Sequence, residues 1–159
     1  MLVVPDSLSL TTLSRIGRLD LVREVYGTLL VPPAVKRDLE RDPYLEQAFT
    51  DRWARIARLS PEENQHVNRL LNKTTLGRTE AQCLALAGRK RAILLLSDKE
   101  ARTIARVRNI GYLGPVGVLL AALGYRTISH LDFRAAFLDL AKVVRPEPAV
   151  VAAALSAAR

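Results

Sequence analysis

The chain has 159 residues, of which 49% are hydrophobic and 25% charged, enough for one domain with a substantial core. This balance excludes a disordered chain, and apolar runs such as Ala149–Leu155 are far shorter than the roughly 20 residues of a membrane span. A single cysteine, Cys83, excludes an internal disulfide framework and a thiolate metal cluster. Because the N-terminus also lacks a signal-peptide pattern, we expect a cytoplasmic protein without a membrane association.

The N-terminal half of the chain alternates short apolar runs with helical patterns. Aliphatic runs predict strands at Leu2–Val4 and Thr28–Val31. Apolar residues at helical spacing predict helices at Ser7–Ile16, at Leu19–Tyr26 and from Ala34 onward. The inner stripe of that third helix is predicted to contain Val35, Leu39, Tyr44 and Phe49. The pattern from Ala48 to Leu59 fits either a continuing helix or a turn into a short strand.

The C-terminal half begins with a strong helix start at Ser60, which is followed by a proline and then by Glu63. Two more strands are predicted at Ala92–Leu96 and Ile110–Leu113. Helices are predicted at Thr79–Ala87, after Asp98, and at Pro115–Leu123, Leu131–Val143 and Pro148–Ala158. The alternation predicts one doubly wound α/β domain, residues 1–159, with a parallel sheet of about four strands flanked by helices. The helices from about residue 130 to 159 form a C-terminal appendage in this prediction.

The run Ala92–Leu96 has the character of a central strand. Its five apolar residues do not alternate with polar ones, which is typical of a strand buried on both faces of a parallel sheet. The strand ends at Ser97 and Asp98, and a helical pattern follows at once. Asp98 is therefore predicted at the carboxyl end of the strand, where ligands and reactive groups gather in open α/β sheets.

Three further acids occupy comparable places in the chain. Asp6 follows the first strand, Asp38 lies in the helix after the second strand, and Glu80 lies in the first turn of a helix. Parallel topology brings Asp6 and Asp98 to one edge of the sheet, and the other two can reach it if their helices begin near that edge or lean over it. Crowded carboxylates repel one another, so a cation would hold such a cluster together. Oxygen ligands alone favour Mg²⁺ or Mn²⁺.

Each acid also has a purely structural interpretation. Asp6 and Asp98 could be N-caps, and Asp38 could pair with a neighbouring cation on a solvated helix face. Two pairs of residues could also form capping boxes, Ser97 with Glu100 and Thr79 with Gln82. The other reactive side chains stand alone in the sequence and are interpreted as packing or surface residues: His66, His130 and Cys83.

The net charge of +8 is concentrated in one region. From Arg89 to Arg126 the chain carries eight basic residues and two acidic ones. A positive surface suits a polyanion, because contacts with phosphates supply affinity that is independent of sequence. Within this region Arg102 and Arg106 are candidates to contact substrate phosphates. Near the N-terminus, Ser7 or Ser9 could add a hydroxyl near a metal, although helix capping explains both serines as well. A solvated helix face in a generally basic protein would give the same charge pattern.

These motifs, in this order, resemble the PIN-domain proteins and, within them, the VapC-like branch known as DUF3368. The resemblance covers a little over half of the chain, and its most specific part is an acid-opened helix of small residues, a buried strand ending in Asp98, and a later Gly-x-x-Gly turn. It implies a ribonuclease in which Asp6, Asp38, Glu80 and Asp98 are catalytic. Asp6, Glu80 and Asp98 would hold one or two Mg²⁺ or Mn²⁺ ions, and RNA would be the substrate.

The resemblance also implies a toxin that an antitoxin protein holds inactive. An antitoxin could insert an arginine among the acids or pack on an apolar stripe near the C-terminus, which could equally be core or a homodimer contact. The stripe consists of Val150, Val151, Ala154 and Leu155.

Three positions depart from the pattern of the branch. Ser97 stands where an aspartate is usual, Thr79 stands where a glycine is usual, and Asp38 replaces the commoner glutamate, with Glu40 as the alternative second acid. These departures leave open a second function, that of an RNA-binding or protein-interaction module with a weakened metal site. A phosphotransfer domain of the receiver type also has acids at strand ends, but it requires them in a different order along the chain.

Overall fold

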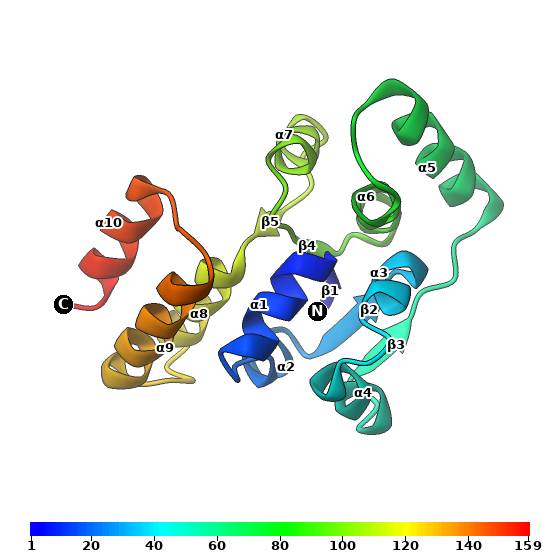
Figure 1. The fold of residues 1–159 in the computed structure, drawn as a ribbon. Helices are drawn as coiled ribbons and strands as arrows, with labels where there is room; N and C mark the ends of the chain where they lie inside the picture. Colours follow the sequence, from blue (N-terminus) through cyan, green and yellow to red (C-terminus); the bar gives the residue numbers. More distant parts are fainter.

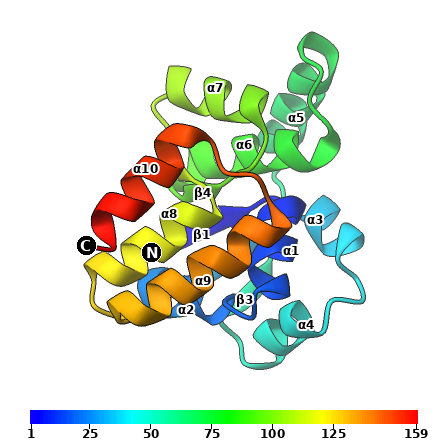
Figure 2. The same ribbon diagram turned by 60° about the vertical axis from the view of Figure 1, so that its left-hand side comes forward.

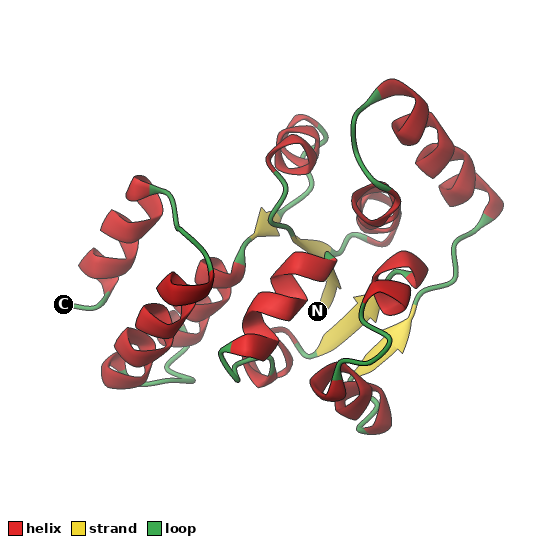
Figure 3. Ribbon diagram, viewed as in Figure 1, coloured by secondary structure: helices red, strands yellow, loops and turns green.

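Five short parallel strands form one sheet in the order β3-β2-β1-β4-β5 (Figures 1 and 3). The structure is a computed structural model that describes residues 1–159. The strands are β1 (Leu2–Pro5), β2 (Thr28–Val31), β3 (Ala54–Ile56), β4 (Ile93–Leu95) and β5 (Tyr112–Leu113). The α/β class and the flanking helices predicted from the sequence are therefore confirmed.

Ten helices surround the sheet. They are α1 (Ser7–Arg15), α2 (Asp20–Tyr26), α3 (Pro33–Asp38), α4 (Pro43–Thr50), α5 (Pro61–Lys73), α6 (Arg78–Lys90), α7 (Lys99–Val107), α8 (Pro115–Gly124), α9 (His130–Val143) and α10 (Pro148–Ala157). Helix α6 packs on β1 and β4 and is contacted by α3, α5 and α7, whereas α2 packs on β1 and β2 and contacts α8. The two helical groups lie on the two sides of the sheet (Figure 2).

The number of strands differs from the prediction of about four. The fifth strand is β3, in the stretch where a turn into a short strand was one of two alternatives. Its signal is weak because β3 pairs only with β2 and lies at an edge, so Ile56 is half exposed and the apolar run is short. The middle strand is β1, not the strand predicted as central. That strand, β4, lies between β1 and β5, and Leu94 and Leu95 are completely buried.

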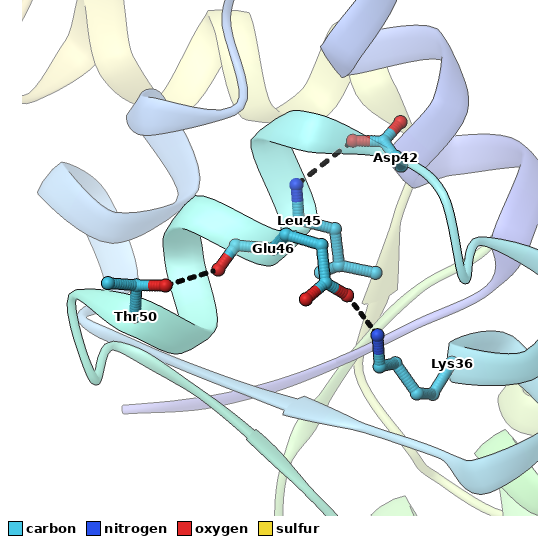
Figure 4. Close-up of polar contacts among 5 residues, drawn as sticks. All are labelled: Lys36, Asp42, Leu45, Glu46 and Thr50. Carbon is cyan, nitrogen blue, oxygen red and sulfur yellow. Dashed lines mark hydrogen bonds and ion pairs between the residues drawn. The ribbon is translucent and has the colours of Figure 1, made fainter.

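The single helix predicted from Ala34 onward is wrong, because it is divided into α3 and α4. Asp42 caps α4 by accepting a hydrogen bond from the backbone N–H of Leu45 at 2.9 Å, and Pro43 takes the first helical position. Figure 4 shows this cap together with the ion pair from Lys36 of α3 to Glu46 of α4. Tyr44 faces solvent with 55% of its surface exposed, so the predicted inner stripe fails at this residue. The division makes Asp38 the last residue of α3.

The C-terminal helices contribute to the same core as the sheet. Four side chains of α9 are buried in the main apolar cluster: Phe133, Ala136, Phe137 and Leu140. In the predicted stripe on α10, Ala154 is buried and Leu155 is exposed, while Val150 and Val151 pack partly against the cluster. The stripe is therefore largely a core contact. No helix combines the length and the apolar character that crossing a bilayer would require.

Candidate active site

The order of the strands reverses between β1 and β4, which makes the carboxyl ends of these two strands the topological switch point of the sheet. Pro5 is in register with Leu95, and the backbone N–H of Asp6 donates to the Leu95 carbonyl at 2.8 Å. Both strands therefore end side by side, as the sequence predicts. The segment after β1 and the segment after β4 both start helices here, α1 and α7 (Figure 1).

Asp6 fastens the two strand ends together. Its side chain is only 2% exposed, and its Oδ1 accepts a hydrogen bond from the Ser9 N–H at 2.8 Å, which caps α1. The other oxygen, Oδ2, accepts from the Ser97 N–H at 2.7 Å across the switch point. Two backbone donors thus compensate for the burial of the carboxylate. Each oxygen keeps a lone pair, because a carboxylate offers about four acceptor sites.

Asp98 also caps a helix, but on the surface. Its Oδ1 accepts from the Ala101 N–H at 2.8 Å at the start of α7, and the residue is exposed. Oδ2 makes no hydrogen bond with the protein. The N-cap interpretation of both Asp6 and Asp98 is thus confirmed, and it leaves one oxygen of Asp98 facing outward beside the switch point.

Asp38 is held by hydroxyl groups from two other helices. Its Oδ2 accepts from Ser7 Oγ of α1 at 2.6 Å and from Thr79 Oγ1 of α6 at 3.2 Å. The Thr79 hydroxyl therefore does not form the capping box that the sequence allowed with Gln82. Thr79 instead orients a carboxylate that lies 41 positions away in the chain.

Gln82 fixes the start of the helix that carries Asp38. This side chain is buried, and its Oε1 accepts from the Ala34 N–H at 2.9 Å. Since α3 begins at Pro33, the bond ties the first turn of α3 to α6. Helix α6 thus contacts both ends of α3. Gln82 holds the first turn, and Thr79 contacts Asp38 at the last residue.

Glu80 lies among the three aspartates. Burial raises the pKa of its carboxyl above the ordinary value, and the negative charges of Asp6, Asp98 and Asp38 raise it further, while a backbone hydrogen bond partly opposes them. Glu80 is thus within electrostatic reach of all three aspartates. Gly77 leaves room for this side chain, because a Cβ at Gly77 would lie only 2.9 Å from Glu80 Oε2.

The position where an aspartate is usual is occupied by a hydroxyl pair. Ser97 Oγ lies 2.8 Å from Ser9 Oγ, so the two serines hydrogen-bond to each other beside Asp6. The capping box predicted for Ser97 with Glu100 is wrong, because Glu100 instead accepts hydrogen bonds from Thr75. Ser97 therefore places an uncharged hydroxyl at this position. An aspartate here would add a negative charge and increase the repulsion among the acids.

The donor set fits a hard divalent cation in chemistry. Carboxylate oxygens and hydroxyls are the ligands that Mg²⁺ and Mn²⁺ prefer. Burial and, after it, repulsion by the three aspartates raise the pKa of Glu80, and a cation would relieve that repulsion. No three His, Cys, Asp or Glu side chains are close enough together to enclose an ion by themselves. An ion bound here would therefore need water molecules among its ligands, as Mg²⁺ commonly has.

The two predicted phosphate-binding arginines differ in their surroundings. Arg102 donates twice to the Leu96 carbonyl, from Nε at 2.9 Å and from Nη2 at 2.6 Å, and its guanidinium lies where a Cβ on Gly114 would clash. It therefore lies at the end of β4, near the acids. Arg106 is exposed in the last turn of α7, about 12 Å along the helix from Asp98, so it does not join them.

Cys83 is a packed thiol, as its apolar neighbours predict. The side chain is buried and its Sγ donates to the Pro5 carbonyl at 3.2 Å. Burial raises the pKa of the thiol well above the ordinary value, and the charges of Asp6 and Glu80 raise it further. The thiol therefore stays protonated beside the site, as a structural contact with β1.

Several positioning residues escape prediction from the sequence. Thr79, Gln82 and the Ser9–Ser97 pair all act through contacts between residues distant in the chain. The only local signal was the presence of polar residues next to predicted acids, and that signal was equally consistent with helix capping.

Comparison with known families agrees with this geometry. The sequence matches a family described as a PIN domain, DUF3368, over residues 2–159. PIN domains are generally nucleases that depend on a divalent metal and act on nucleic acid. The chain has no match among curated proteins.

Proposed function

Because the chain belongs to the PIN-domain family, we propose that it is a metal-dependent endoribonuclease that hydrolyses phosphodiester bonds in RNA. Two observations support the proposal. Asp6 and Asp98 follow strands that end side by side at the switch point. Glu80 is partly buried near them, and the charges of Asp6, Asp98 and Asp38 add to the effect of burial in raising its pKa.

The acids would divide the work according to their surroundings. Glu80 and Asp98, whose Oδ2 makes no hydrogen bond with the protein, would hold Mg²⁺ or Mn²⁺ together with Asp6, which keeps free lone pairs beside its two backbone donors. A bound divalent ion would stabilise charge on the phosphoryl oxygens and lower the pKa of an attacking water. Asp38, held by Ser7 and Thr79, would accept a hydrogen bond from that water and orient it. Arg102 supports the strand end and offers its remaining N–H groups to a phosphate.

Labelled RNA distinguishes this proposal from its alternative. The protein should cleave single-stranded RNA in buffer containing Mn²⁺ or Mg²⁺, and excess EDTA should stop the reaction. Single-stranded DNA and RNA duplexes of the same sequence serve as comparison substrates. Cleavage that persists in EDTA would contradict the metal-dependent mechanism. Binding without cleavage in any metal would instead support a nucleic-acid-binding module on the PIN fold.

Replacing Thr79 with valine should lower kcat/KM for RNA about three- to tenfold, because the Asp38 carboxylate loses one of its two hydroxyl donors, a bond worth about 1 kcal/mol at this exposed position. Thr79→Ser keeps the hydroxyl and should retain activity. Thermal unfolding midpoints of both variants should stay within a few degrees of the wild type, since only one hydrogen bond of about 1 kcal/mol is lost. Equal activity of the valine and serine variants would show that this hydrogen bond does not position Asp38 for the reaction.

We further propose that the nuclease is a toxin and that a protein antitoxin covers the acids. A cavity of about 640 Å³ adjoins them, lined by Ser97, Arg102 and Val116 on the sheet side and by the segment before α10. Its apolar wall suits a side chain of a partner, and a second copy of the chain could use the same face as a homodimer. Expression of the wild type should arrest bacterial growth, whereas expression of Asp98→Asn should not. Equal growth of the two cultures would contradict the toxin role.

A further inference from the structure

A basic cavity lies at the opposite end of the sheet from the acids. It has a volume of about 680 Å³ and is enclosed by α5, the end of α6, the start of β4 and the turn after α7. Its charged and polar lining consists of Glu62, Glu63, His66, Arg69, Arg89, Arg91, Arg108 and Asn109. Three of these residues, Arg89, Arg91 and Arg108, belong to the basic region that the sequence singles out. The proposed catalytic site uses none of them.

This cavity continues along the molecule toward the acids. A second cavity of about 350 Å³ between α5 and α7 shares His66, Arg69 and Arg108 with the first and adds Lys73 and Thr74. Both helices pack on α6, which lies below them (Figures 1 and 2). We call the two cavities together the α5–α7 groove.

On α7 the α5–α7 groove is lined by Ile104 and Arg108, which lie in the second half of the helix and at its C-cap. Closer to the acids, Thr75, next to Thr74, donates to Glu100 from its backbone N–H and its hydroxyl. Glu100 lies two residues after Asp98, which caps the same helix. From Asp98 to Arg108 the helix and its cap span about 15 Å, so a strand bound in the groove would extend past the Thr75–Glu100 contact to reach the acids.

The cations of the groove are largely without protein counter-ions. Arg69, Lys73, Arg91 and Arg108 form no salt bridge, and Arg89 has one exposed partner, Glu62, at 3.4 Å. Glu63 is buried and occupied by its capping box with Ser60. These cations can therefore make contacts with an external anion without breaking a native ion pair.

His66 does not add a charge to the groove at neutral pH. Burial lowers the pKa of its imidazole, and the nearby charges of Arg108 and Arg69 lower it further. The neutral ring contacts the Arg108 guanidinium through Nε2 and can accept a hydrogen bond from it. Arg108 is thus oriented toward the groove with its positive charge intact.

We propose that the α5–α7 groove binds the phosphate backbone of single-stranded RNA and guides the strand toward the carboxylates. The choice of RNA rests on the function proposed above, whereas the binding of a polyanion rests on the unpaired cations. No Phe, Tyr or Trp lines the groove, so bases have no aromatic platform to stack on and the contacts are independent of sequence. An RNA of a few nucleotides bound at the acids would be too short to occupy it.

Binding measured in EDTA tests the groove without any cleavage. Fluorescence anisotropy would give the affinity for a labelled single-stranded 20-nucleotide RNA at several KCl concentrations. The groove variant is Arg69→Ala with Arg108→Ala, and the matched control is Arg15→Ala with Arg23→Ala, two exposed arginines on α1 and α2 that form no salt bridge. For the groove variant, the slope of log K against log [KCl] should become shallower by about 1.4, since each contact with a single strand contributes about 0.7. The control should keep the wild-type slope.

The outcomes separate the groove from the nuclease. If the wild type cleaves RNA, the groove variant should raise KM for the 20-nucleotide RNA at least severalfold and leave cleavage of a four-nucleotide RNA unchanged. If the wild type does not cleave, a selective loss of affinity in the groove variant still supports the groove. Equal slopes for wild type and groove variant, or equal losses in the groove variant and the control, would overturn it. Displacement of the RNA by polyaspartate at the same charge concentration would also overturn it, in favour of an acidic protein partner.

Discussion

Replacing Glu80 with glutamine should raise the thermal unfolding midpoint of the metal-free protein at pH 7 and reduce metal-dependent RNA cleavage by more than about 100-fold. The stabilising effect follows from the raised pKa of Glu80 in the folded state, which burial and the three aspartates cause. A carboxyl of this kind favours the folded state below its unfolded pKa, near 4.5, and loses that contribution as the pH rises through the folded pKa. At pH 7 the ionised side chain therefore destabilises the fold, and neutral glutamine removes that cost.

The expected loss of cleavage follows from the proposed role of Glu80 as a metal ligand. Replacing a residue that only supports a metal ligand typically lowers metal affinity or activity about 10- to 100-fold, and replacing the ligand itself should lower activity further. Differential scanning fluorimetry at pH 4 to 8, with and without Mn²⁺, measures the stability half of this prediction. The difference between the variant and the wild type should shrink as the pH falls toward 4.5, and Mn²⁺ should raise the midpoint of the wild type more than that of the variant. Glu24→Gln is the matched control, because Glu24 is exposed on α2 and forms no salt bridge, and it should change neither quantity. A destabilised Glu80→Gln protein that still cleaves RNA would contradict both the electrostatic account and the assignment of the ligand.

Replacing Asp6 with alanine should cost about 2–4 kcal/mol of unfolding free energy, whereas Asp98→Ala should cost about 1 kcal/mol. Both residues are N-caps, so each variant loses one helix cap. Asp6→Ala additionally leaves the Ser97 N–H without its acceptor in a partly buried position between β1 and β4. Removing either charge also relieves repulsion with Glu80, and the gain is greater for Asp6, so the expected difference between the two variants is a lower bound on the contribution of the extra hydrogen bond.

Urea unfolding followed by circular dichroism measures both values under the same conditions. If Asp6→Ala is too unstable to purify, Asp6→Asn keeps an acceptor for the Ser9 N–H and should fall between the two alanine variants. Equal losses for Asp6→Ala and Asp98→Ala would show that the bond to Ser97 contributes little and that Asp6 is an ordinary cap.

The sequence predicts those parts of the fold that depend on local patterns. The strand Thr28–Val31 has the predicted bounds, and the capping box at Ser60 and Glu63 is present, because aliphatic runs and helix-start motifs act over a few residues. The break between α3 and α4 was missed although Asp42 and Pro43 form a recognisable helix start. The prediction failed because the apolar residues on either side of the break keep a spacing that is also compatible with one continuous helix.

The convergence of the acids could be predicted only in part. Asp6 and Asp98 follow directly after strands, and the parallel pairing of β1 with β4 brings these two strand ends to the same edge of the sheet. The place of Asp38 depends on hydroxyl donors from α1 and α6, and no local pattern encodes a contact between three helices. The groove between α5 and α7 is beyond prediction for the same reason, since its cations come from three elements that become neighbours only in the folded chain.

The double attachment of Asp6 has an evolutionary consequence. A descendant that no longer needed chemistry could exchange Glu80 without loss of stability and Asp98 at the cost of one helix cap. A change at Asp6 would in addition remove the hydrogen bond that links the ends of β1 and β4. Inactive relatives of this chain should therefore retain an aspartate at this position after the other acids have drifted. Presence of the first acid alone is thus a poor diagnostic of activity, and the pair Glu80 and Asp98 is the informative one.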